Sequence, residues 1–133
     1  MTLKDELGTC RDVRMHRGKG LIHAYSYFHE KIDAPVNLWD LVIEPADYVG
    51  YHQHDGNLEI LYILSGTAEH FQNGERCLLG PGHAVLVKSG QAHAIRNPGD
   101  EDLRYLVVFT AVSDAERGSV ENLPLPEELS DWQ

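Results

Sequence analysis

The 133-residue sequence predicts an all-β fold, either a sandwich or a closed barrel. Short apolar segments recur along the chain, and turns rich in glycine, proline and asparagine separate them. The segment 37–44 alternates as a half-buried strand does, with Trp39, Leu41 and Ile43 on the face expected to point into the barrel. No segment of convincing length repeats with helical periodicity before residue 113.

The expected strands follow one another through short connections. Pro45 ends the strand at 37–44, and Asn73-Gly74 is a strong hairpin signal between two others. Glycine and proline also predict turns at 80–82, 89–90 and 97–100. The predicted strands are 21–28, 37–44, 48–54, 59–64, 67–72, 75–79, 83–88, 92–96 and 103–110.

The length suits one domain with a real hydrophobic core. We expect residues 1–20 to form an N-terminal arm, which is either an edge strand or a dimer arm, and residues 21–112 to form the barrel. Residues 113–133 form an acidic tail, expected to be docked or mobile. Its apolar residues could instead pack on a partner subunit; these are Leu123, Leu125, Leu129 and Trp132.

Composition excludes several classes of partner. The formal charge of −10 argues against nucleic acid and anionic membranes, because binding phosphates requires clustered lysine and arginine. No apolar stretch approaches the roughly 20 residues of a membrane span, and the charged N-terminus lacks the apolar core of a signal peptide. Cys10 and Cys77 are expected to be reduced thiols, so we expect a cytoplasmic protein.

Three histidines and one glutamate form the most informative pattern. His52 and His54 fall on the same face of a predicted strand, because side chains alternate with a period of two. Glu59 opens the next apolar run, and His93 follows much later. Three imidazoles and one carboxylate suit a borderline divalent metal, so we expect one ion of iron, manganese, nickel, zinc or cobalt. In octahedral geometry, four protein ligands leave about two positions for water or substrate.

The segments that carry these residues resemble the two motifs of the cupin family. Residues 46–66 are similar to G(X)5HXH(X)3,4E(X)6G, and residues 82–97 are similar to G(X)5PXG(X)2H(X)3N. Ala46 replaces the first glycine and Lys88 replaces the proline, but neither position is a metal ligand. The resemblance implies a cupin double-stranded β-helix, which is a small jelly-roll barrel, with the metal on the four residues named above.

The predicted strand faces suggest which residues surround the metal. Leu61 and Ile63 share the face of Glu59 and, with Trp39, are expected to line a substrate pocket. Tyr48 shares the predicted face of His52 and His54, which makes it a candidate pocket wall or catalytic proton donor, or else a rim aromatic. The remaining histidines are assigned no role; these are His16, His23, His29, His70 and His83.

Two classes of function follow. The first is a metal-dependent enzyme acting on a small oxygen-bearing substrate, of the dioxygenase, decarboxylase, isomerase or cyclase type that the resemblance implies. The alternative is a non-catalytic module that binds a sugar, an organic acid or another metabolite. We also expect a homodimer formed by sheet extension or strand exchange, because the aromatic strand 21–28 would be exposed at a sheet edge.

Overall fold

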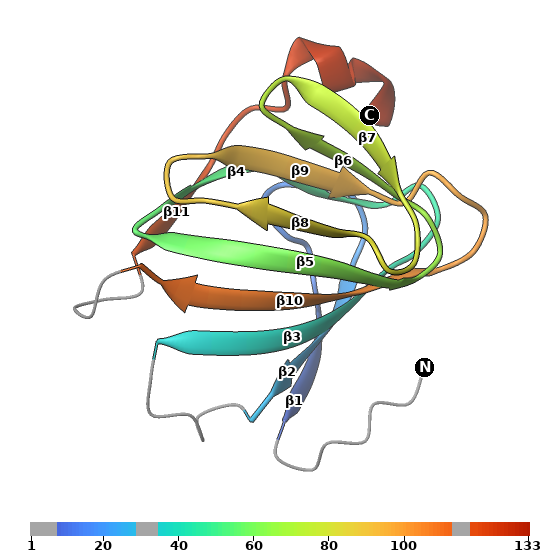
Figure 1. Cartoon of the computed structure of the whole chain (residues 1–133). Coiled ribbons are helices and arrows are strands. Elements are labelled where there is room, and N and C mark those ends of the chain that lie inside the picture. The colour runs from blue at the N-terminus through green and yellow to red at the C-terminus, as the bar shows by residue number, and fades with distance from the viewer. Residues whose placement is uncertain (1–7, 29–34, 113–117) are drawn as a thin grey trace.

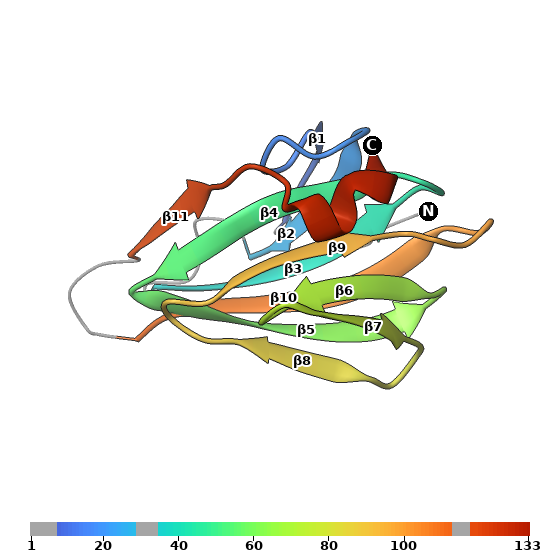
Figure 2. The same cartoon turned by 90° about the horizontal axis from the view of Figure 1, so that it is seen from above.

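The computed structural model describes residues 8–28, 35–112 and 118–133. Its strands form two antiparallel sheets that face each other, as Figures 1 and 2 show. The all-β prediction is therefore confirmed. The alternating sequence pattern has a direct consequence in the inner strands: Asn57–Ser65, for example, buries every second residue between the sheets and turns the others outward.

The larger sheet has six strands in the order β1-β2-β3-β10-β5-β8. Residue-by-residue pairing runs across the whole sheet, with Leu41 of β3 beside Tyr105 of β10 and Ala24 of β2. Its members are β1 (Thr9–Val13), β2 (Ile22–Tyr27), β3 (Val36–Ile43), β10 (Leu103–Ala111), β5 (Asn57–Ser65) and β8 (Ala84–Val87).

The smaller sheet has five strands in the order β11-β4-β9-β6-β7. The predicted hairpin at Asn73-Gly74 joins β6 to β7, and both residues have positive φ, as this type of turn requires. The members of this sheet are β11 (Ser119–Asn122), β4 (Tyr48–Asp55), β9 (Ala92–Arg96), β6 (Ala68–Gln72) and β7 (Glu75–Leu79).

The hydrophobic core fills the space between the two sheets. Leu41 and Ile43 of β3 lie in it, as their predicted inward face requires, and Trp39 packs against it. Further buried members come from both sheets and include Ile22, Val49, Leu61, Ile63, Ile95, Leu103 and Val107. Burial of these side chains, at roughly 1.5–3 kcal/mol each, supplies most of the free energy that holds the sheets together.

The N-terminal arm contains an edge strand and then crosses to the other sheet. β1 pairs with β2, so β2 is an inner strand rather than an edge. This corrects the premise that strand 21–28 exposes its aromatic surface at an edge, and Tyr25 is only 4% exposed. The homodimer itself stays a prediction. Beyond β1, Lys19 exchanges backbone hydrogen bonds with Tyr48 of β4.

Close contact with the arm explains one glycine of β4. The N–H of Gly50 donates a hydrogen bond to the carbonyl of Met15 at 3.0 Å. A Cβ atom on Gly50 would lie 1.7 Å from the carbonyl oxygen of His16, which is impossible without moving the backbone. Glycine at position 50 therefore lets residues 15–16 lie directly against β4.

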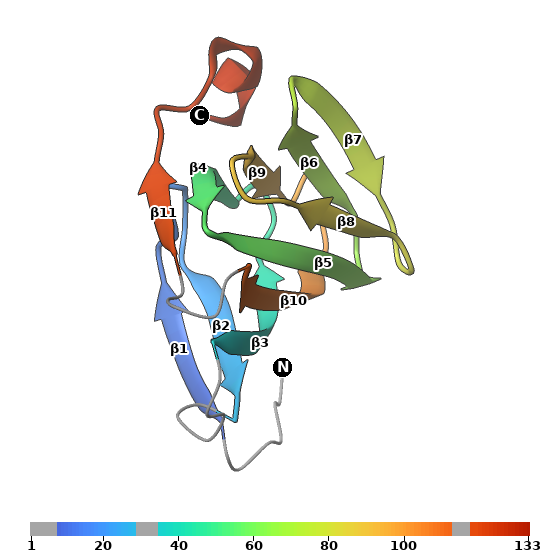
Figure 3. The ribbon, with the colours of Figure 1, turned by 60° about the vertical axis from the view of Figure 1, so that its left-hand side comes forward.

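The C-terminal segment docks on the outer side of the smaller sheet (Figure 3). β11 pairs with β4, and a 3-10 helix, η1 (Glu127–Trp132), follows it. Leu129 and Trp132 are buried against Tyr48, Phe71 and Ala94. The indole N–H of Trp132 also donates a hydrogen bond to Glu69 at 2.7 Å. These apolar tail residues thus pack on their own chain. No helix within the described residues is long and apolar enough to cross a membrane.

Candidate metal centre

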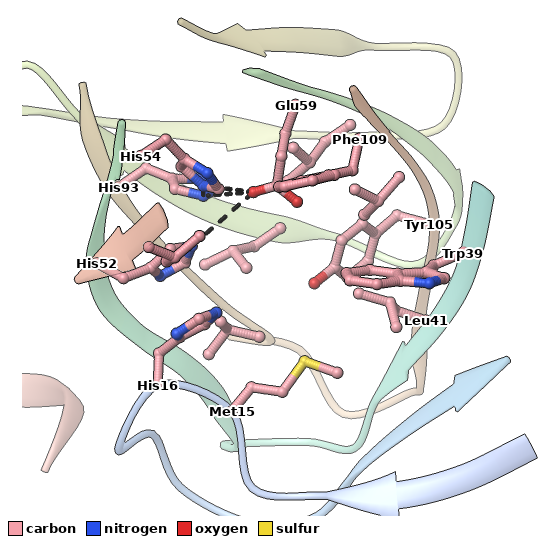
Figure 4. Close-up of a pocket in the computed structure, with 15 residues that line it drawn as sticks. Met15, His16, Trp39, Leu41, His52, His54, Glu59, His93, Tyr105 and Phe109 are labelled. Atoms are coloured by element: carbon pink, nitrogen blue, oxygen red, sulfur yellow. Dashed lines mark hydrogen bonds and ion pairs between the residues drawn. The ribbon is translucent and has the colours of Figure 1, made fainter. Parts of the chain in front are cut away.

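Strands from both sheets bring the four predicted ligands together. His52 and His54 lie on β4, and His93 lies directly opposite His52 on the neighbouring β9. Glu59 reaches the same point from β5 of the facing sheet, as Figure 4 shows. One ligand atom of each residue lies within 4.8 Å of every other, and all four residues are buried.

Glu59 lies at the centre of this cluster, close to all three imidazoles. Its Oε1 atom lies 2.6 Å from Nε2 of His54, 3.3 Å from Nε2 of His93 and 3.9 Å from Nε2 of His52. Burial would raise the pKa of Glu59, but the three nearby imidazoles, two of them within hydrogen-bond distance, outweigh burial and lower this pKa well below its ordinary value. The carboxylate therefore stays ionised inside the protein.

The imidazoles respond to the same environment in different ways. Burial lowers the pKa of His93 to about 3, although the carboxylate of Glu59 accepts a hydrogen bond from this ring and acts in the opposite direction. Burial would also lower the pKa of His54, but the close carboxylate of Glu59 reverses the shift and raises it. His93 is thus a neutral imidazole at physiological pH, the protonation state in which histidine binds metals.

Hydrogen bonds on the far side of each ring fix the orientation of the histidines. His52 donates from Nδ1 to the backbone carbonyl of Gly50 at 2.7 Å. His54 donates from Nδ1 to the side-chain oxygen of Asn57, also at 2.7 Å. Because a carbonyl oxygen only accepts, Nδ1 carries a proton in both rings. A metal that replaced the proton between Nε2 and Glu59 would then meet an Nε2 lone pair directed at the cluster.

His93 is held in the same way by a residue to which the sequence assigned no role. Nδ1 of His93 lies 2.9 Å from Nε2 of His70, which is buried on β6. β6 lies beside β9 in the sheet, so His70 is brought next to His93 by strand pairing. When Nε2 of His93 acts as a ligand, its Nδ1–H donates to His70. Alternation along 67–72 could have placed His70 on an inward face, but not beside His93.

These donors fit a divalent transition metal. Three imidazole Nε2 atoms and one ionised carboxylate converge, and the Nδ1 atom of each imidazole has its own hydrogen-bond partner. Such outer hydrogen bonds are usual for metal-binding histidines. The fit rests on the arrangement of the residues and does not select among iron, manganese, nickel, zinc and cobalt, because this ligand set accepts all of them.

A cavity of about 180 Å³ opens beside the four ligands. Its wall is mostly apolar, and the predicted pocket residues Trp39 and Leu61 both contribute to it. Ile63 does not; it lies two residues farther along β5 and is buried in the core. The other lining residues are Met15, His16, Leu41, Val49, Ile95, Tyr105, Val107, Phe109 and Val120.

The predicted position of Tyr48 is wrong. Between the pairs Val49–Ile95 and His52–His93, β4 advances three residues while β9 advances only two, so β4 contains a bulge. The extra residue reverses the alternation, and Val49 rather than Tyr48 shares the inner face with His52. Tyr48 packs on the opposite side against Trp132, with ring centroids 5.5 Å apart.

Two other polar side chains reach the cavity in its place. The hydroxyl of Tyr105 is directed into the cavity (Figure 4), and burial raises the pKa of Tyr105, so this group stays protonated. His16 of the N-terminal arm stacks on His52, with ring centroids 3.7 Å apart, and its Nδ1 lies 2.6 Å from the side-chain oxygen of Asn122. No local sequence pattern identifies His16, because only the crossing of the arm brings it here.

The other histidines of the described chain lie away from the cluster. His23 lies between Asp12 and Glu44, 2.7 Å from a carboxylate oxygen of each. His83 accepts a hydrogen bond from the N–H of Gly80 in an exposed turn. His29 lies outside the described residues.

Comparisons with known proteins agree with this geometry. The cupin domain family matches residues 39–109. The oxalate-binding protein of Thermotoga maritima is 38% identical over 101 residues, which cover 74% of this chain and 84% of that protein. A crystal structure of a predicted oxalate decarboxylase from the same organism superposes with a TM-score of 0.72 at 28% identity, covering 84% of this chain and all of the other.

A third similarity concerns the fold alone. The polyketide cyclase RemF of Streptomyces resistomycificus superposes with a TM-score of 0.75 at 21% identity, covering 96% of this chain and 89% of the other. These likenesses confirm the predicted double-stranded β-helix. The family match spans more than half of the residues and includes the three strands that carry the ligands. The chain therefore belongs to the cupin domain family.

Proposed function

We propose that the protein is a metal-dependent enzyme that acts on a small oxygen-bearing organic substrate. The observation that carries this proposal is the convergence of four buried ligand atoms within 4.8 Å at the wall of an apolar cavity. We assign His52, His54, Glu59 and His93 as ligands of one divalent transition metal. A metal bound there would act as a Lewis acid toward a carboxylate or carbonyl oxygen.

The wall of the cavity suggests how a substrate would be held. None of the described residues that line it is a lysine or an arginine, so the metal would be the main positive charge available to an anionic substrate. Apolar residues such as Leu61 and Val107 exclude water, and the Tyr105 hydroxyl can donate a hydrogen bond to a substrate oxygen. This favours a carboxylate or hydroxy-ketone that binds the metal through two oxygens.

Metal content tests the ligand assignment. The purified protein should contain close to one transition-metal ion per chain, and the double substitution His52→Ala with His93→Ala should abolish binding. His83→Ala is a matched control, because His83 lies in an exposed turn and should leave the metal content unchanged. Unchanged metal content in the double variant would overturn the assignment.

Ligand binding tests the proposed role of the metal. Calorimetry with oxalate should show binding to the metal-loaded protein and a large loss of affinity after the metal is stripped. Equal affinity in the two forms would contradict the proposal, and a pocket based on hydrogen bonding alone would then explain the binding better.

Non-catalytic binding is the second candidate function. It is favoured by the relative from Thermotoga maritima, whose name is oxalate-binding protein. A binding module would retain oxalate unchanged over many hours, whereas an enzyme would consume its substrate. Product analysis over a panel of small organic acids and hydroxy-ketones, with and without dioxygen, separates the two. Saturable, metal-dependent binding without turnover across that panel would favour the binding module.

A further inference from the structure

We infer that the metal cavity continues into a second, polar compartment, and that the two together bind an elongated dicarboxylate-like ligand whose far end is held by Arg11. This inference rests on the proposed metal site, which would hold the near end of the ligand. It extends the ligand class from a compact acid such as oxalate to a longer molecule with an apolar middle and two anionic ends.

The two compartments share part of their walls. The second compartment has a volume of about 140 Å³ and lies over the inner face of β1, β2 and β3. Met15 and Trp39 line both compartments, so the two compartments adjoin at these side chains. The remaining residues of the second compartment are Thr9, Arg11, Ala24, Ser26 and Asn37.

Strand register shows that both compartments lie over one continuous surface. Residues directly opposite each other in paired strands point to the same face of a sheet. One row of paired residues crosses the larger sheet through Ile63, Tyr105, Leu41, Ala24 and Arg11. The next row passes through Leu61, Val107, Trp39, Ser26 and Thr9. Both rows are apolar near the metal ligands and polar at the β1 edge.

The polar end of this surface is equipped to bind an anion. Arg11 is exposed, and within the described parts of the chain its guanidinium has no hydrogen-bond or ion-pair partner. It is the only lysine or arginine among the described residues lining either compartment. The indole N–H of Trp39 donates to the hydroxyl of Ser26 at 3.1 Å, which leaves the hydroxyl proton of Ser26 free to point at a ligand.

The dimensions require a ligand longer than oxalate. Glu59 lies on β5 and Arg11 on β1, four strand spacings apart in the sheet order. At about 4.8 Å per spacing, their backbones are about 19 Å apart along the sheet, and the two long side chains shorten the gap that a ligand must bridge. Oxalate would occupy only the metal end. A linear molecule would lay its middle along Trp39 and Met15.

Isothermal titration calorimetry on the Zn²⁺-loaded protein tests the inference. The probes are oxalate, the linear dicarboxylates from glutarate to sebacate, and the monocarboxylate of each chain length. At one chain length the dicarboxylate should bind more tightly than its matched monocarboxylate. Arg11→Ala should remove about tenfold of affinity for that dicarboxylate and leave oxalate and the monocarboxylates unchanged, because only the distal carboxylate meets the guanidinium.

Lys88→Ala is the matched control. It removes the same charge at an exposed position after β8, the opposite edge of the same sheet, and should leave every probe unchanged. If oxalate binds in a metal-dependent manner but no dicarboxylate depends on Arg11, the second subsite is wrong and the proposed metal site stands. If no probe shows metal-dependent binding, the proposed function fails, and this inference fails with it.

Discussion

Removing the imidazole of His70 should weaken metal binding even though His70 is not a ligand. When His93 binds a metal through Nε2, its Nδ1–H donates to Nε2 of His70, which lies 2.9 Å away, and both residues are almost fully buried. His70→Ala leaves that N–H without a partner in a site that water reaches poorly. A buried polar group that loses its partner costs about 1–3 kcal/mol, which corresponds to about 5- to 150-fold in an equilibrium constant.

Removing the outer hydrogen-bond partner of a metal-binding residue typically lowers metal affinity by about 10- to 100-fold, which is a similar range. We therefore expect His70→Ala to weaken Zn²⁺ binding by about 10- to 100-fold, because the ring of His93 is then free to rotate or to change tautomer. His70→Gln keeps a hydrogen-bond acceptor in the same direction and should recover part of the loss.

The assay is competition for Zn²⁺ against a chromophoric chelator at pH 7.5, with unfolding curves of the metal-free variants to check folding. His83→Ala serves as the control, because this histidine lies in an exposed turn away from the ligands. An affinity of His70→Ala within twofold of the unsubstituted protein would refute the argument. Equal losses in His70→Ala and His70→Gln would show that an acceptor at this position is not enough to restore metal binding, and would contradict the hydrogen-bond explanation.

Three further perturbations test the docked tail, the protonation states and the pocket wall. Trp132→Ala should destabilise the fold by about 3–5 kcal/mol in urea denaturation, because the indole is 2% exposed; a loss below 1 kcal/mol would show that the tail contributes little. The metal-free protein should lose stability as pH falls from 6.5 toward 4. Burial lowers the pKa of His70 to about 4 and that of His93 to about 3 in the folded protein. The unfolded chain therefore takes up protons at a higher pH than the folded protein does, and this favours unfolding. The raised pKa of His54 opposes this trend, and an equal or larger unfolding free energy at pH 5 than at pH 7.5 would contradict the net direction. Leu61→Phe should weaken oxalate binding and preserve metal content, because it fills the cavity and replaces none of the four metal-binding residues; full retention of oxalate affinity would place the oxalate elsewhere.

The fold class and the four candidate ligands could be predicted from the sequence alone. Both depend on local patterns, since alternation with a period of two defines which residues of a strand share a face, and glycine-rich turns mark where strands end. His52 and His54 could be assigned to one face because only one residue separates them. Glu59 and His93 could be assigned as ligands because they stand at the ligand positions of the two cupin motifs, whose spacing reflects how the strands of the family pair.

Which other residues reach the cavity depends on the tertiary structure. The bulge in β4 reversed the alternation between Tyr48 and His52, so Tyr48 packs against Trp132 and the tyrosine of the cavity is Tyr105. An alternating pattern cannot reveal such a bulge, because one extra residue changes every face that follows it. His16 and His70 reach the metal centre through pairing between segments distant in sequence, and such contacts depend on the packing of the whole chain rather than on its local pattern.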